Sequence, residues 1–209
     1  KAANKAALQA ELQLATDPAV PLLGMVSRQV GQKGIDLVIE ALPILLARNL
    51  QCVVLGTGEA RYEQALRALA RQYPGKLTVI IGYDETLAHR IIAGADFFLM
   101  PSRFEPCGLT QLYSLRYGTV PVVHRVGGLN DSVTDADTAS LAEGRATGIV
   151  FEPANSAALV QAVERGIVLY QKRRAWQALR RRGMQQDFSW QHSAAEYQQL
   201  YDELVPRPG

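Results

Sequence analysis

The sequence predicts an α/β protein built on a doubly wound parallel sheet with helices on both faces. Short apolar runs alternate along the chain with longer segments whose apolar residues recur every three or four positions. The short runs are apolar throughout, as in strands that are buried on both faces. The helical segments between them can supply the crossovers that parallel strands require.

The composition fits one globular domain. The chain has 209 residues, of which 48% are hydrophobic, 20% charged and 7% aromatic, enough to bury a single core. A net charge of +2 gives no field that would favour nucleic acid. We find no apolar run long enough to span a membrane and no signal-peptide pattern, so we expect a cytosolic protein without a membrane partner.

Cysteine and histidine are too sparse to indicate a metal site or a disulfide framework. Cys52 and Cys107 have no metal-ligating companions at close spacing. His89, His124 and His192 are scattered and form no paired motif. We therefore expect no metal.

The first half of the chain opens with a helix at residues 2–14, where Leu8, Leu12 and Ala15 share one stripe. Residues 21–26 are a short apolar run between turn residues, typical of a buried strand. The alternation then predicts, in order, a helix at 34–48, a strand at 51–55, a helix at 59–73 and a strand at 77–81.

The second half continues with a helix at 85–94, a strand at 96–100, a helix at 109–117 and a strand at 120–123. An irregular stretch at 134–146 precedes a short strand at 148–151, and helices follow at 157–173, 175–186 and 193–204. The last helix carries an apolar stripe that either packs on the core or stays exposed: Tyr197, Leu200, Tyr201 and Leu204. Residues 206–209 should be frayed.

An open parallel sheet binds its ligand beyond the carboxyl ends of its strands, so the loops after residues 26, 55, 81, 100 and 123 are the candidate site. Arg28 and Lys33 precede and open a helix after the first strand, a pattern suited to a diphosphate, although a solvated loop would look the same. The turn at 56–58 lacks the third glycine of the dinucleotide fingerprint, which disfavours a nicotinamide dehydrogenase. Instead of a ligand-binding glycine turn, residues 56–58 could equally form a simple tight turn that caps the next helix.

Three further loops carry candidate residues with two interpretations each. Tyr83 could stack on a nucleobase or be a partly buried loop tyrosine beside an N-cap at Asp84. Glu105 lies between two prolines, where a rigid loop could hold it against a sugar hydroxyl, but it could also be a surface carboxylate. Gly127 and Gly128 would let the backbone approach a phosphate closely or form a common turn.

The string PSRFEPCGLTQL at residues 101–112, followed by YGTVPVV at 117–123 and GGL at 127–129, resembles the signature of bacterial glycogen synthases and plant starch synthases. The similarity runs from residue 2 to residue 204. It implies the Rossmann-like C-terminal domain of a GT-B glycosyltransferase, a fold in which two such domains face each other across a cleft. It also implies that glucose passes from ADP-glucose to the non-reducing end of an α-1,4-glucan with retention and without a metal or other cofactor, so that ADP is the product.

The resemblance implies a role for the matching residues on the nucleotide side. Arg28 and Lys33 would neutralise the departing diphosphate, and Gly127 and Gly128 would bind its distal phosphate through their backbone N–H groups. Tyr83 would stack on adenine.

On the sugar side, Glu105 would hold the transferred glucose together with the backbone of Cys107, Gly108 and Leu109. Thr110 would touch the phosphate. Many retaining GT-B enzymes carry a second glutamate eight residues after the first, but Tyr113 stands there in this chain, a difference that glycogen synthases share.

The family's N-terminal acceptor domain, with its lysine-glycine-glycine motif and a catalytic-site histidine, is absent from these residues. We therefore expect residues 1–209 to form the nucleotide-sugar-binding domain, with 193–209 as terminal helix and tail, and to meet the glucan only through the missing domain. Such a chain would be inactive alone and would belong to a bacterial cytosol, or to a plastid if the source is a plant. The alternatives are a transferase that uses UDP-glucose and a non-catalytic nucleotide-binding module.

Overall fold

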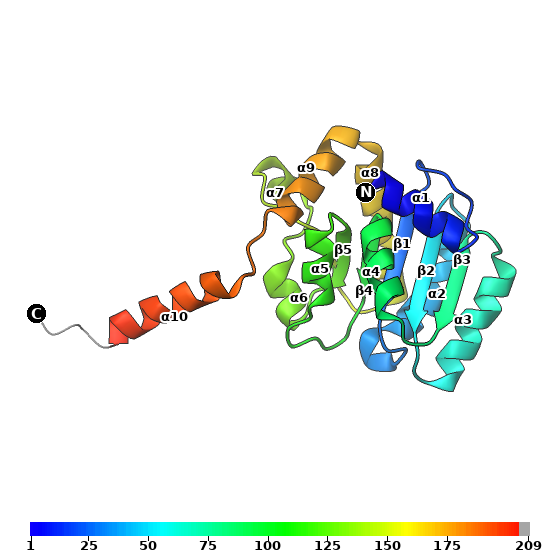
Figure 1. Cartoon of the computed structure of the whole chain (residues 1–209), viewed down its shortest axis with the longest axis horizontal. Coiled ribbons are helices and arrows are strands. Elements are labelled where there is room, and N and C mark those ends of the chain that lie inside the picture. The colour runs from blue at the N-terminus through cyan, green and yellow to red at the C-terminus, as the bar shows by residue number, and fades with distance from the viewer. Residues whose placement is uncertain (205–209) are drawn as a thin grey trace, which may run out of the picture.

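A computed structural model describes residues 1–204 and confirms the doubly wound α/β class (Figure 1). Six parallel strands pair in the order β3-β2-β1-β4-β5-β6. The predicted strands agree with the observed ones to within one residue at each end. The observed bounds are β1 Leu22–Val26, β2 Gln51–Gly56, β3 Leu77–Ile81, β4 Phe97–Met100, β5 Val120–His124 and β6 Ile149–Phe151.

Helices cover both faces of the sheet. In Figure 1, α1, α4 and α5 lie in front of the strands, and α2 and α8 lie behind them. The helices are α1 Ala2–Glu11, α2 Ile35–Leu46, α3 Ala60–Gln72, α4 Glu85–Gly94, α5 Thr110–Arg116, α6 Gly127–Ser132, α7 Thr138–Ala142, α8 Ser156–Gln171, α9 Arg173–Met184 and α10 Trp190–Leu204, with a 3₁₀ turn, η1, at Gly31–Lys33.

Four local predictions are wrong, and one of them is the start of α10, which lies at Trp190 and not at residue 193. The stretch 134–146, expected to be irregular, contains α7, which begins where the Asp137 carboxylate accepts a hydrogen bond from the Ser140 backbone N–H at 2.7 Å. Helix α6 and the turn η1 were not anticipated, because neither is long enough to show a helical period. Helix α1 ends at Glu11, three residues before the predicted end at residue 14, and Gln13 just beyond it takes a positive φ of 56°.

Successive strand residues feed two cores. Leu22 and Phe98 belong to the core under α1 and α4, whereas Leu23 and Phe97 belong to the core under α2 and α8. This alternation is the two-residue period of a strand, and it explains why runs buried on both sides are apolar at every position. Beneath α8 and α9, the Phe97 ring lies 4.9 Å from the Trp176 ring, centroid to centroid.

Helix α10 projects away from the sheet (Figure 1). Its apolar stripe is exposed, which decides between the two alternatives left by the sequence: Tyr197, Leu200, Tyr201 and Leu204 all lie outside the core. The predicted frayed tail at 206–209 lies outside the described residues.

The strand order places a topological switch point between β1 and β4. From β1 the chain continues outward to β2 and β3 on one side, and from β4 it continues to β5 and β6 on the other. The crossovers therefore leave β1 and β4 in opposite directions and open a crevice beyond their carboxyl ends. The fold thus predicts a ligand site at the loops that follow Val26 and Met100.

Candidate functional site

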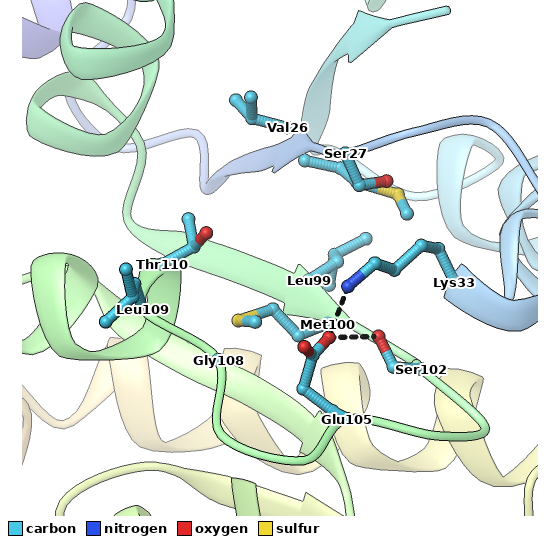
Figure 2. Close-up of a pocket in the computed structure, with 11 residues that line it drawn as sticks. Val26, Ser27, Lys33, Leu99, Met100, Ser102, Glu105, Gly108, Leu109 and Thr110 are labelled. Atoms are coloured by element: carbon cyan, nitrogen blue, oxygen red, sulfur yellow. Dashed lines mark hydrogen bonds and ion pairs between the residues drawn. The ribbon is translucent and has the colours of Figure 1, made fainter. Parts of the chain in front are cut away.

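A cavity of about 360 Å³ lies at this switch point (Figure 2). The ends of β1 and β4 form its floor, and the loop from β4 to α5 forms its wall. Lys33, Glu105, Gly108, Leu109 and Thr110 line it, as the sequence led us to expect. Other lining residues carried no sequence signal, because only the strand order brings them together: Met25, Val26, Ser27, Leu99, Met100 and Ser102.

Lys33 and Glu105 meet inside this cavity. The Lys33 ammonium lies 2.5 Å from the Glu105 carboxylate, and the Ser102 hydroxyl donates to the same carboxylate oxygen at 3.2 Å. The two charged side chains keep 20% and 10% of their surface exposed. Glu105 is thus a largely buried, paired carboxylate and not a surface one.

The loops that carry these two residues are tied to each other. The Arg103 guanidinium donates to both carboxylate oxygens of Asp36, at 2.7 and 2.6 Å, and the Arg103 backbone N–H donates to the Gln32 carbonyl. The hydrogen bonds from Arg103 hold the pKa of Asp36 below its ordinary value. His124 Nδ1 lies 2.9 Å from the Ser102 carbonyl, which requires a proton on that nitrogen. The loops that carry Lys33 and Glu105 are therefore held together by contacts within the protein.

A second cavity, of about 210 Å³, adjoins the first and shares Val26 and Ser27 with it. Arg28 and Tyr83 line this second cavity, and the Tyr83 side chain is 87% exposed. The neighbouring Asp84 caps α4 by accepting the Leu87 N–H at 2.8 Å. The structure thus brings Arg28 and Tyr83 together while giving Asp84 the cap role that the sequence allowed.

The turn at residues 56–58 serves packing. A Cβ on Gly56 would lie 1.8 Å from the Ser27 carbonyl oxygen, and one on Gly58 would lie 2.2 Å from the Gln29 carbonyl oxygen. The Glu63 carboxylate reaches back from α3 and accepts the Gly58 N–H at 2.9 Å and the Thr57 hydroxyl at 2.7 Å, and these hydrogen bonds lower the pKa of Glu63. This geometry favours the simple tight turn, which lets the loops after β1 and β2 touch. The expectation that this turn also caps the next helix is wrong, because Glu59 is the N-cap residue of α3 and makes no side-chain cap hydrogen bond.

Gly127 and Gly128 line neither cavity. The Gly128 N–H donates to the Glu105 carbonyl at 3.1 Å, so the expectation that it is free to bind a phosphate is wrong for this structure. A Cβ on either glycine would lie 2.2 Å from a backbone carbonyl oxygen of the facing loop, Glu105 for Gly127 and Cys107 for Gly128. The glycine pair therefore lets the two loops close on each other.

Cys107 stands apart from the other predicted sugar-side residues. Its side chain is exposed and lines neither cavity, whereas Gly108, Leu109 and Thr110 do line the first one.

Among the side chains that the structure describes, no three metal-ligating groups come together, and none of the described helices has the length and apolarity for a bilayer crossing.

Residues 9–181 match the family described as Glycosyl transferases group 1. The chain belongs to this family of glycosyltransferases. Within it, the chain is 56% identical over 206 residues to a glycogen synthase of Anaeromyxobacter dehalogenans, covering 99% of this chain and 42% of that protein. A second relative, glycogen synthase 2 of Nitrosococcus oceani, is 53% identical over 205 residues, covering 98% of this chain and 42% of the relative.

Solved structures agree with these relatives. The catalytic domain of Starch Synthase IV from Arabidopsis thaliana, bound to ADP and acarbose, superposes with a TM-score of 0.86 at 34% identity, over 98% of this chain and 43% of that one. Sucrose-phosphate synthase from Thermosynechococcus elongatus, at 24% identity and a TM-score of 0.68 over 94% of this chain and 48% of that one, shares the fold. The chain spans about two-fifths of the length of the glycogen synthases that it matches.

Proposed function

We propose that residues 1–209 form the donor-binding, C-terminal domain of a glycogen or starch synthase that transfers glucose from ADP-glucose to an α-1,4-glucan with retention. The observation that carries this proposal is the pairing of Lys33 with Glu105 in a cavity at the switch point, beside a second cavity that holds Arg28 and Tyr83. A nucleoside diphosphate sugar carries a nucleoside at one end and a sugar at the other, and the two adjoining cavities offer a place for each end.

The nucleoside fits the second cavity, whose lining is mostly apolar and whose rim carries the exposed ring of Tyr83. Such a ring can stack on adenine at little cost in conformational entropy. Arg28 lines the same cavity, next in the chain to Ser27, which both cavities share, and it supplies a cation for the diphosphate.

The sugar and the adjacent phosphate fit the first cavity. When the glycosidic bond breaks, negative charge develops on the leaving diphosphate, so fixed cations at that point stabilise the transition state more than the ground state. Lys33 and Arg28 supply those cations, and this scheme requires neither a metal nor a cofactor. Glu105 accepts hydrogen bonds from the sugar hydroxyls and favours positive charge at the anomeric carbon.

The acceptor glucan binds the part of the protein that lies outside this chain, so these residues alone bind the donor but do not transfer glucose. The exposed stripe of α10 is free to contact that part. The named relatives are bacterial, and we place the complete enzyme in a bacterial cytosol.

A calorimetric titration of the purified chain with ADP, and in parallel with UDP, tests this proposal. We expect saturable binding of ADP that exceeds binding of UDP and weakens in Arg28→Ala and in Lys33→Ala. Arg90→Ala is the matched control, because Arg90 pairs with Glu11 at 2.8 Å and lines neither cavity. It removes the same kind of charge and should leave ADP affinity unchanged.

Preference for UDP would move the chain to a transferase that uses UDP-glucose. Binding of ADP that is equally strong in Arg28→Ala and Lys33→Ala would contradict the assignment of the two cavities. Absence of any binding would refute a donor site that is complete within these residues.

A further inference from the structure

Among the residues that the structure describes, the buried side-chain atoms without a hydrogen-bond partner are the amide oxygens of three glutamines, Gln9, Gln29 and Gln111. An unpaired buried oxygen is unfavourable, but the amide nitrogen of each of these glutamines donates hydrogen bonds. Gln111 differs from the other two in its location, because it lies directly behind the loop that carries Glu105.

The Gln111 side chain holds this loop from the inside. Its Nε2 donates to the Cys107 carbonyl at 2.9 Å and lies 3.1 Å from the Gly108 carbonyl. Rotating the amide by half a turn would bring its oxygen against these two carbonyl oxygens, so the nitrogen must face them. The side chain is buried, with 1% of the residue exposed. Gln111 therefore fixes the backbone between Glu105 and Thr110 without touching either cavity.

The same amide reaches the glycine pair. Gln111 Nε2 lies 3.2 Å from the Ser132 hydroxyl, which donates to the Gly128 carbonyl at 2.5 Å. The Gly128 N–H in turn donates to the Glu105 carbonyl at 3.1 Å. These contacts form a closed chain of hydrogen bonds from the Glu105 loop through Gln111, Ser132 and Gly128 back to the Glu105 loop.

We propose that Gln111 is a positioning residue for donor binding, which acts with Ser132 to fix the Glu105 loop against the Gly127-Gly128 turn. Through this network the backbone of Gly108, Leu109 and Thr110 and the carboxylate of Glu105 keep one geometry in the cavity. The functional part rests on the proposed donor site, whereas the coupling of the two loops stands without it.

The residue type follows from this role. Methionine has about the same length and packs equally well but cannot donate to a carbonyl oxygen. Glutamate would place a carboxylate against the carbonyl oxygens of Cys107 and Gly108. The amide nitrogen of Gln111 carries two hydrogens, which it shares among these two carbonyl oxygens and the Ser132 hydroxyl.

Amide hydrogen exchange of the whole chain, followed by mass spectrometry on peptides covering 104–112 and 126–134, tests the coupling. The variants are Gln111→Met and Ser132→Ala, with Gln9→Met as the matched control. Gln9 is also buried with an unpaired amide oxygen, but its nitrogen bonds to Asp17 and Gln51 far from the site. We expect Gln111→Met to speed exchange about five- to tenfold in both peptides, and Gln9→Met to leave both unchanged.

An ADP titration of the same variants gives the functional readout. Gln111→Met should weaken ADP binding roughly tenfold, and Gln9→Met should not, although both lower the melting temperature. Exchange that stays unchanged in peptide 126–134 of Gln111→Met would overturn the coupling. If the wild-type chain binds no ADP while exchange rises in both peptides, the donor site fails but the coupling holds; ADP binding equal in Gln111→Met and wild type would refute the positioning role.

Discussion

Replacing Lys33 with methionine removes the cation from an ion pair that is largely shielded from solvent. The side chains of Lys33 and Glu105 are 20% and 10% exposed, and their charged atoms lie 2.5 Å apart. After the change, the Ser102 hydroxyl at 3.2 Å is the one side-chain partner that the described part of the chain leaves to the Glu105 carboxylate. The variant thus leaves a charge in a mostly closed site with one neutral partner.

The cost follows from that shielding. Breaking a fully buried ion pair costs about 3–5 kcal/mol, and breaking an exposed one costs about 0–1 kcal/mol. This pair lies between these limits, so we expect the free energy of unfolding to fall by about 2 kcal/mol in Lys33→Met. For a chain of this size the melting temperature should drop by about 4–8 °C. Glu105→Gln should cost about 1 kcal/mol, because the more exposed Lys33 can turn toward water.

Urea unfolding of the wild type, both single variants and Lys33→Met/Glu105→Gln measures the coupling between the two side chains. The double variant should be more stable than the sum of the single effects predicts, by about 1 kcal/mol or more. ADP titration of the same variants should show opposite effects on affinity. Lys33→Met should weaken ADP binding, whereas Glu105→Gln should strengthen it, because the competing carboxylate charge is gone. Additive stabilities, or ADP binding that weakens in Glu105→Gln, would refute this description of the site.

The remaining predictions concern the loops around the cavity. Because Arg103 lowers the pKa of Asp36, their pair stabilises the fold above that carboxyl's ordinary pKa of 3.8 and loses the contribution as the pH falls below it. Asp36→Asn should therefore lower the free energy of unfolding by up to about 1 kcal/mol near neutral pH and by little in strong acid, as urea titrations at both pH values will show. Gly128→Ala would place a methyl group 2.2 Å from the Cys107 carbonyl oxygen and should cost about 1–3 kcal/mol of stability, measured by thermal unfolding. Iodoacetamide should modify Cys107 at once but Cys52 only on unfolding, because burial closes off that thiol and raises its pKa to about 12, and mass spectrometry resolves the two sites.

Two results would contradict the predictions for Gly128→Ala and Asp36→Asn. The control for Gly128→Ala is Gly31→Ala, whose added methyl would meet the Tyr62 hydroxyl oxygen at an ordinary 3.5 Å and should be tolerated. Equal melting temperatures for the two alanine variants would remove the argument from close loop contact. A stability loss in Asp36→Asn that is as large in strong acid as at neutral pH would show that packing, and not charge, holds the pair.

The strands could be predicted closely because each is a local pattern. Residues 77–81 and 120–123 are apolar runs between turn residues, and such runs need no knowledge of the rest of the chain. Helices α6 and α7 were missed because six and five residues are too few for a helical period to repeat. Their ends depend on contacts such as the Asp137 cap, which only the folded chain reveals.

Seven of the predicted residues line the two cavities, but their contacts could not be predicted. Lys33 and Glu105 each follow a recognisable strand, yet they are 72 positions apart, and their meeting depends on β1 and β4 being neighbours in the sheet. For Gly128, the sequence could not decide between two alternatives. Its sequence context allowed a phosphate contact or a turn, and its N–H is already taken by the Glu105 carbonyl, an acceptor 23 positions earlier that no local pattern could identify.

The two tryptophans of the chain lie in contrasting surroundings, which makes their fluorescence separable. Trp176 is buried against Phe97 in the core, so its emission reports unfolding of the domain. Trp190 begins α10 and is 86% exposed, so its emission lies at longer wavelength and reports whatever covers that helix. A blue shift confined to Trp190, when the remainder of the protein is added in trans, would record docking while Trp176 serves as an internal reference.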